Sequence, residues 1–157
     1  MLERVDLPAV VDADALFGFE PVERDAPTVL TPHSGELARL LGTDSGWVEA
    51  HRLESARSAA ERFRSVVLLK GADTIVAAPT GGCIVCDLGP PALATAGTGD
   101  VLTGIVAAFL SKGIEPQVAA AAAAVAHATA ASLAPQSEGL VAGDLLGLLP
   151  QALAANK

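Results

Sequence analysis

Short runs that are apolar or nearly so alternate along this chain with longer segments in which apolar residues recur every three or four positions. A strand that is covered on both faces is apolar throughout, so the runs predict buried strands over 8–11, 28–31 and 66–69. The recurring pattern predicts helices over about 36–41, 47–64, 98–112, 117–134 and 144–155. Two further strands, 74–78 and 83–86, flank a Pro- and Gly-containing turn and predict a β-hairpin.

This alternation predicts a single α/β domain over residues 1–157, with three α/β/α layers and a mostly parallel sheet. We expect the hairpin to lie towards one edge of the sheet. The 98–112 helix is expected to begin at the carboxyl ends of the strands, which is where open α/β sheets bind their ligands.

The helix predicted over 47–64 has two distinct faces. Its apolar stripe is predicted to face the core and consists of Trp47, Ala50, Leu53, Ala56, Ala60 and Phe63. Acid–base pairs three residues apart predict a solvent-exposed outer face, not a binding patch, and are Glu49/Arg52, Glu54/Arg57 and Glu61/Arg64.

Composition narrows the possible functions. Of the 157 residues, 51% are hydrophobic and 18% are charged, and the net charge is −8. An acidic surface repels nucleic acid and anionic membranes, so we expect neither as a partner and expect any phosphate site to be local. The longest apolar run, 118–126, is too short to span a bilayer, and the acidic N-terminus is no signal peptide, so we expect a cytoplasmic protein.

Cys83 and Cys86 have the spacing of a redox or zinc half-site. Their segment is predicted to be a strand, in which residues three apart point to opposite faces. A second Cys pair is absent and the three histidines are scattered, so we interpret both residues as ordinary buried thiols.

The strongest chemical signal is Gly97-Thr98-Gly99-Asp100, where a glycine turn leads into a helix. Free N–H groups and the positive end of the helix dipole favour an anion there. Asp100 would repel a bound phosphate, which suggests that it takes a proton from a substrate hydroxyl while the N–H groups hold a phosphoryl group. The alternative is that Thr98 caps the helix and Asp100 is simply an acid of the first turn.

Polar residues also follow the predicted strands. Asp12 and Asp14 follow the first strand as candidate ligand-binding carboxylates, or as caps of the next turn. His33 lies between the second strand and a helix, where it could bind a ligand or bond the local backbone. Lys70 follows the third strand, where it could reach a nucleotide phosphate or simply end the strand. His127, on an Ala-rich helix, is expected to be a core or rim histidine.

Four blocks in register carry a family resemblance: Asp12-Ala13-Asp14-Ala15-Leu16, Leu30-Thr31-Pro32-His33-Ser34-Gly35-Glu36, Leu68-Leu69-Lys70-Gly71-Ala72-Asp73-Thr74 and the stretch from Ala94 to Gly104. With them the chain closely resembles the ADP/ATP-dependent NAD(P)H-hydrate dehydratases of the ribokinase-like superfamily. Those enzymes repair NADH or NADPH whose nicotinamide ring has been hydrated. They use a nucleotide phosphoryl group to make the ring hydroxyl a leaving group, which is then eliminated.

The resemblance implies a role for each matching position. His33 would contact the hydrated dinucleotide, and Lys70, Gly71, Ala72, Asp73 and Thr74 would line the site of ADP or ATP. The loop from Pro90 through Thr95 and Ala96 would close over the nucleotide, Gly97-Thr98-Gly99 would form the anion hole, and Asp100 would be the base at the substrate hydroxyl. Mg²⁺ would bridge the phosphates through nucleotide oxygens and water, so no protein metal ligand is expected.

Two departures from the family pattern leave alternatives open. Gly89-Pro90-Pro91-Ala92 stands where the family usually has an Asn-Pro-Gly run, and the strands that would precede Met1 in the family are not in this sequence. The alternatives are a small-molecule hydroxyl kinase of the same superfamily and a non-catalytic nucleotide-binding fragment. Strand 8–11 would have an unpaired edge, so a homo-oligomer is expected to cover it.

Overall fold

The computed structural model describes residues 2–136 and 138–155. They form one five-stranded sheet in the order β1-β2-β3-β4-β5. Its strands are β1 (Ala9–Val11), β2 (Thr28–Leu30), β3 (Val66–Leu69), β4 (Thr74–Ala77) and β5 (Cys83–Cys86). The pairs β1·β2 and β2·β3 are parallel, whereas β3·β4 and β4·β5 are antiparallel. The described sheet is therefore mixed and not mostly parallel, because the hairpin supplies two of its five strands.

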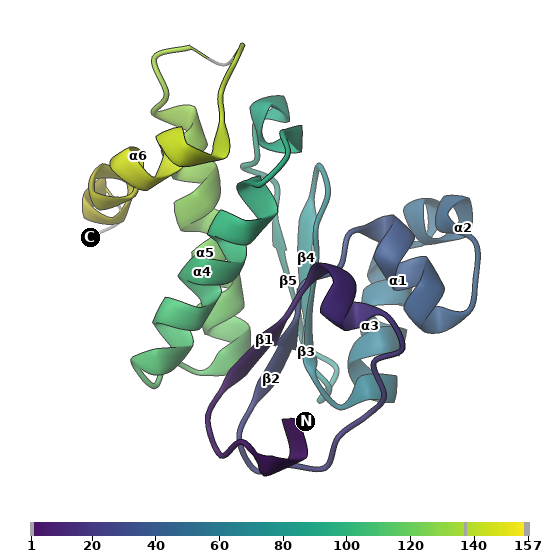
Figure 1. The fold of residues 1–157 in the computed structure, drawn as a ribbon. Helices are drawn as coiled ribbons and strands as arrows, with labels where there is room; N and C mark the ends of the chain where they lie inside the picture. The colour runs from purple at the N-terminus through teal and green to yellow at the C-terminus, as the bar shows by residue number, and fades with distance from the viewer. Residues whose placement is uncertain (1, 137, 156–157) are drawn as a thin grey trace.

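Helices cover both faces of this sheet (Figure 1). On one face lie α1 (Ser34–Leu41), α2 (Ser45–Ala50) and α3 (Arg52–Phe63); on the other lie α4 (Thr98–Ser111), α5 (Pro116–Ser132) and α6 (Ala142–Ala155). Three short 3-10 helices complete the described secondary structure: η1 (Leu2–Arg4), η2 (Ala13–Leu16) and η3 (Pro91–Ala94). No helix in the described ranges is long and apolar enough to cross a membrane.

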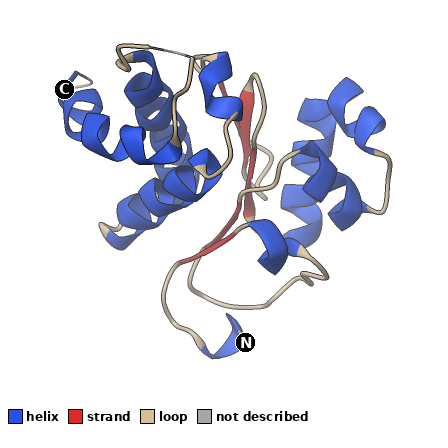
Figure 2. Cartoon of the chain, turned by 45° about the horizontal axis from the view of Figure 1, so that its top comes forward, coloured by secondary structure: helices blue, strands red, loops and turns tan. Residues whose placement is uncertain are grey.

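The sheet has helices on both of its sides (Figure 2), and its strands divide their side chains between two cores. In β3, Val67 and Leu69 pack with the α1 and α3 residues, while Val66 and Leu68 pack with those of α4 and α5. This follows from the period of two in a strand, and it explains why an apolar run such as Val66–Leu69 has no polar position. The three layers predicted from the sequence are present, and the hairpin lies at one edge as expected.

The helix predicted over 47–64 is two helices that meet at His51. The backbone of His51 has φ −130° and ψ 45°, outside the helical region, and its ring stacks on Trp47 with centroids 4.5 Å apart. Asp44 begins α2 by accepting hydrogen bonds from the Gly46 and Trp47 N–H groups. Residue Arg64, αL at φ 49°, ends α3.

The predicted inner face of this region is confirmed for Ala56, Ala60 and Phe63, which are buried, and is wrong for Trp47, Ala50 and Leu53. Trp47 and Leu53 are 39% and 47% exposed, whereas Val48 is fully buried. The buried stripe runs through Val48, Ala56 and Ala60 to Phe63, and Arg52 lies on the same stripe at helical spacing. Trp47 and Leu53 are large and apolar, which favours the core, but α2 and α3 turn Val48 and small alanines towards the core and leave these two side chains near solvent.

The two cysteines lie in β5, the outer strand of the hairpin. Cys86 is buried and Cys83 is half-buried, and both are free thiols. Cys83 packs against the core on the α1 side. In the part of the chain that is described, no group of three His, Cys, Asp or Glu side chains could hold a metal ion.

Candidate functional site

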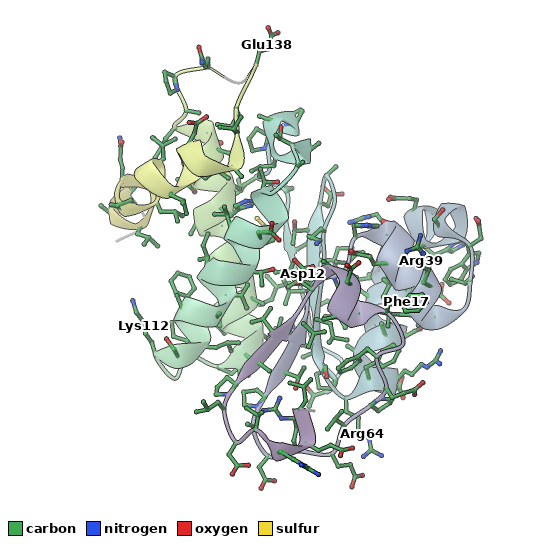
Figure 3. The ribbon with its side chains drawn as sticks, in the orientation of Figure 1. Asp12, Phe17, Arg39, Arg64, Lys112 and Glu138 are labelled. Atoms are coloured by element: carbon green, nitrogen blue, oxygen red, sulfur yellow. The ribbon has the colours of Figure 1, made fainter. Side chains whose placement is uncertain are left out.

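A polar network joins the carboxyl ends of two strands to α4. Lys70 Nζ, just after β3, lies 2.8 Å from Oδ1 of Asp12, just after β1. The other carboxylate oxygen of Asp12 accepts a 2.8 Å hydrogen bond from the Thr103 hydroxyl of α4. Glu36 of α1 approaches Lys70 Nζ to 3.8 Å. Figure 3 places Asp12 where β1 ends, between α4 and the η2 segment.

The environment of Asp12 favours its charged form. Burial by itself raises the pKa of this carboxyl, but the hydrogen bonds from Lys70 and Thr103 and the charge of Lys70 outweigh burial, and the pKa lies below the usual 3.8. Asp12 is therefore an ionised carboxylate at neutral pH. It fixes the Lys70 ammonium in place and neutralises part of its charge.

A glycine turn leads directly into α4, as the sequence predicts. Gly97 precedes α4 in the left-handed region at φ 85°. The Thr98 hydroxyl does not cap the helix, because it donates to the carbonyls of Leu93 and Thr95 at 2.7 and 2.8 Å. The capping alternative for Thr98 is therefore wrong, and the hydroxyl instead anchors the loop that follows η3.

The turn also presents a donor next to the Lys70 cation. The Thr98 and Asp100 N–H groups bond the carbonyls of Thr95 and Gly97, but the Gly99 N–H makes no hydrogen bond with a described residue. A Cβ built on Gly99 would lie 3.5 Å from Lys70 Nζ. A helix N-terminus and a lysine thus converge, as an anion site requires.

His33 is the N-cap of α1, which bears out the local-backbone interpretation. Its Nδ1 accepts from the Gly35 and Glu36 N–H groups at 3.0 and 3.2 Å, and the Glu36 side chain accepts from the His33 N–H to complete a capping box. An Nδ1 that accepts two hydrogen bonds leaves the ring proton on Nε2. The His33 side chain is 59% exposed, and its Nε2 lies 3.5 Å from Oε1 of Glu36.

The start of α1, α2, the end of β3, η3, α4 and α5 surround a cleft of about 730 Å³. Of the residues expected to bind nucleotide or substrate, the cleft is lined by His33, Lys70, Gly71, Ala72, Thr74, Thr98 and Gly99. It is not lined by Asp73, Thr95, Ala96, Gly97 or Asp100. Polar lining comes from the starts of α1 and α4, from α2 and from the end of β3, whereas η3, α4 and α5 add an apolar wall that includes Leu93, Leu102 and Ala124.

Asp100 lies in the first turn of α4, one position after the cleft residue Gly99, and its side chain is exposed. An exposed carboxylate at this point can accept a proton from a group that enters over the glycine turn. Its role as a base stays a prediction.

Some cleft residues were missed by the sequence reasoning or given no ligand role. His127 of α5 is buried, as expected, but it also lines the cleft. Burial lowers the pKa of His127 and outweighs a hydrogen bond with the backbone of Thr98, which raises it. Ser34, Ser45 and Glu49 line the cleft as well, and only their spacing around the N-termini of α1 and α2 could have suggested them.

Comparison with known proteins decides the family. A model of the NAD(P)H-hydrate dehydratase family matches residues 1–153. The chain belongs to this family. Its fold is ribokinase-like, as the sequence resemblance implied.

Individual relatives agree with this membership. A bifunctional NAD(P)H-hydrate repair enzyme, Nnr, from Moorella thermoacetica is 47% identical over 161 residues, which cover 98% of this chain and 30% of that enzyme. An ADP-dependent (S)-NAD(P)H-hydrate dehydratase from Neisseria meningitidis is 41% identical over 157 residues, covering 94% of this chain and 52% of the relative. The chain thus spans only part of the length of these relatives.

A solved structure adds the ligand class of one family member. The ADP/ATP-dependent NAD(P)H-hydrate dehydratase from Bacillus subtilis, co-crystallised with ATP and Mg²⁺ and soaked with CoA, superposes with a TM-score of 0.92 at 34% identity. The match covers 97% of this chain and 57% of that one.

Proposed function

We propose that this chain takes part in the nucleotide-dependent dehydration of hydrated NADH or NADPH. The observation that carries the proposal is the convergence of Lys70, the Gly99 N–H and His33 on one cleft. The apolar wall of the cleft suits a purine ring, and its Lys70 side suits phosphate. Relatives with ADP-dependent dehydratase names support the same reaction.

The described residues fit a nucleotide phosphate. Lys70 supplies positive charge, and Asp12 keeps its ammonium at the strand end while lowering the net charge that a phosphate would meet. The Gly99 N–H is a free donor at a helix N-terminus, and glycine lets a phosphoryl oxygen approach the backbone closely. Mg²⁺, when bound, would bridge phosphate oxygens and reduce their charge, and no protein ligand is proposed for it.

Two residues would act on the hydrated dinucleotide. Asp100 would take the proton of the ring hydroxyl as the hydroxyl oxygen bonds to the terminal phosphorus of ADP or ATP, while the bond from that phosphorus to the bridging oxygen breaks and AMP or ADP leaves. ADP or ATP supplies the phosphoryl group that turns the hydroxyl into a leaving group. The ring C–O bond then breaks with its electron pair leaving on phosphate, and loss of a proton from the adjacent ring carbon restores the double bond. His33, through Nε2–H, would orient the substrate.

Binding and turnover of the wild-type chain test the proposal directly. Calorimetry should detect ADP binding with Mg²⁺ present, and addition of hydrated NADH should restore NADH absorbance. Asp100→Asn keeps the size of the side chain but removes the base, so turnover should fall by about 10²–10⁴ while ADP affinity is unchanged or higher. His33→Ala should raise KM for the hydrate without changing ADP affinity.

Each alternative outcome has its own meaning. Unchanged repair by Asp100→Asn contradicts the base assignment. ADP binding without any repair identifies the chain as a nucleotide-binding portion of the family fold. Phosphorylation of hydroxymethylpyrimidine by ATP in place of repair identifies a small-molecule kinase.

A further inference from the structure

Arg52, the first residue of α3, joins three segments of the fold through one side chain. Its Nη2 donates to the carbonyls of Asp73 and Lys70 at 2.8 and 3.2 Å. Its Nη1 donates to the Ser34 hydroxyl at 3.0 Å and pairs with Glu49 at 3.2 Å. The side chain is only 16% exposed. The solvated-face interpretation of the Glu49/Arg52 pair is therefore wrong for Arg52.

The loop that follows β3 closes around this guanidinium. A Cβ built on Gly71 would lie 2.2 Å from Nη2 and 2.6 Å from Cζ of Arg52. Any side chain at position 71 therefore requires Arg52 to move away from the two carbonyls that it bonds. Arg52 can occupy this position only because residue 71 is a glycine.

Arg52 stands behind the cleft and does not line it. The segments that it bonds do line it: Lys70, Gly71 and Ala72 on the loop, and Ser34 beside His33. We propose that Arg52 is a positioning residue that fixes the loop 70–73 against the start of α1, so that the nucleotide side and the substrate side of the cleft keep one mutual geometry. This proposal rests on the nucleotide site proposed above.

Arginine suits this task better than lysine does. A planar guanidinium can donate to several acceptors at once, in fixed directions, whereas an ammonium is a single point charge. Removal of Arg52 leaves the Lys70 and Asp73 carbonyls without this donor, so the loop gains freedom that nucleotide binding must then remove. Loss of Arg52 should therefore weaken nucleotide binding and leave the rate of the chemical step unchanged.

The first experiment compares Arg52→Ala and Arg52→Lys with Arg57→Ala, an exposed arginine of the same helix and a matched loss of charge. We expect Kd and KM for ADP to rise about tenfold in both Arg52 variants, with kcat at saturating ADP within about twofold of wild type. Arg57→Ala should behave as wild type. A proportional fall of kcat without a change in ADP affinity, or full rescue by lysine, overturns the proposal.

The second experiment tests the mutual dependence of the two positions. Gly71→Ala should weaken ADP binding in the wild-type background but add little to Arg52→Ala, because the side chain that it displaces is already gone. Additive effects overturn the proposal.

Hydrogen exchange of the 71–73 amides, measured without nucleotide, separates this proposal from the nucleotide site itself. Faster exchange in both Arg52 variants than in Arg57→Ala supports the positioning role even if the wild-type chain binds no ADP, an outcome that would contradict only the proposed function. Equal exchange in all three variants overturns it.

Discussion

Replacement of Asp12 by asparagine tests whether the network at the strand ends supports the fold as well as the site. Asparagine keeps one acceptor for Thr103 but can place an NH₂ group against the Lys70 ammonium. Breaking a buried ion pair costs about 3–5 kcal/mol. Here the side chains of Lys70 and Asp12 are 22% and 11% exposed, so solvent screening reduces the expected loss to about 2–3 kcal/mol.

Thermal and denaturant unfolding measure this loss. For a chain of this size the melting temperature should fall by about 5–10 °C. Thr103→Val, which removes one hydrogen bond and keeps the ion pair, should cost about 1 kcal/mol, and the exposed Asp14→Asn is the control that should cost nothing. The wild-type advantage should begin to shrink as the pH falls below 3.8 and should be lost once the pH passes below the lowered pKa of Asp12 in the folded state, because in this range the unfolded chain binds the proton before the folded chain does. A loss below 0.5 kcal/mol for Asp12→Asn at pH 7, roughly the range of ordinary surface substitutions, would refute the reasoning.

Three further predictions concern other parts of the fold. Stability should fall as the pH drops below 6.5, because burial lowers the pKa of His127 in the folded state and the unfolded state takes up the proton first; His127→Gln should flatten this limb of a pH-dependent unfolding series. Gly97→Ala should cost about 1–2 kcal/mol for its left-handed φ of 85°, with a new Cβ 3.1 Å from that of Ala142, and unchanged denaturant unfolding would contradict it. The outer edge of β1 is unpaired among the described strands, so sedimentation should show a homo-oligomer, whereas a stable monomer at micromolar concentration would count against the idea.

Local sequence patterns were enough to predict those strands, helix ends and turns whose conformation depends on a single segment of the chain. The apolar run at Val66–Leu69 predicts a buried strand and forms one, and Gly42, in the left-handed region at φ 71°, ends α1 where the apolar stripe ends. The glycine turn before α4 was identified because only small residues allow it. Family membership also followed from the sequence, since four blocks in register are far more specific than any one of them.

Other features depend on contacts between segments that lie far apart in the chain. Asp12, Lys70 and Thr103 meet only because β1, β3 and α4 end or pass at one edge of the sheet, and no local pattern records that meeting. Arg52 has the spacing of a surface ion pair in the sequence, yet the carbonyls of the 70–73 loop lie within its reach and turn it inward. The physical reason is that periodicity reports which face of an element is apolar, whereas the partners of a polar side chain are set by the packing of the whole fold.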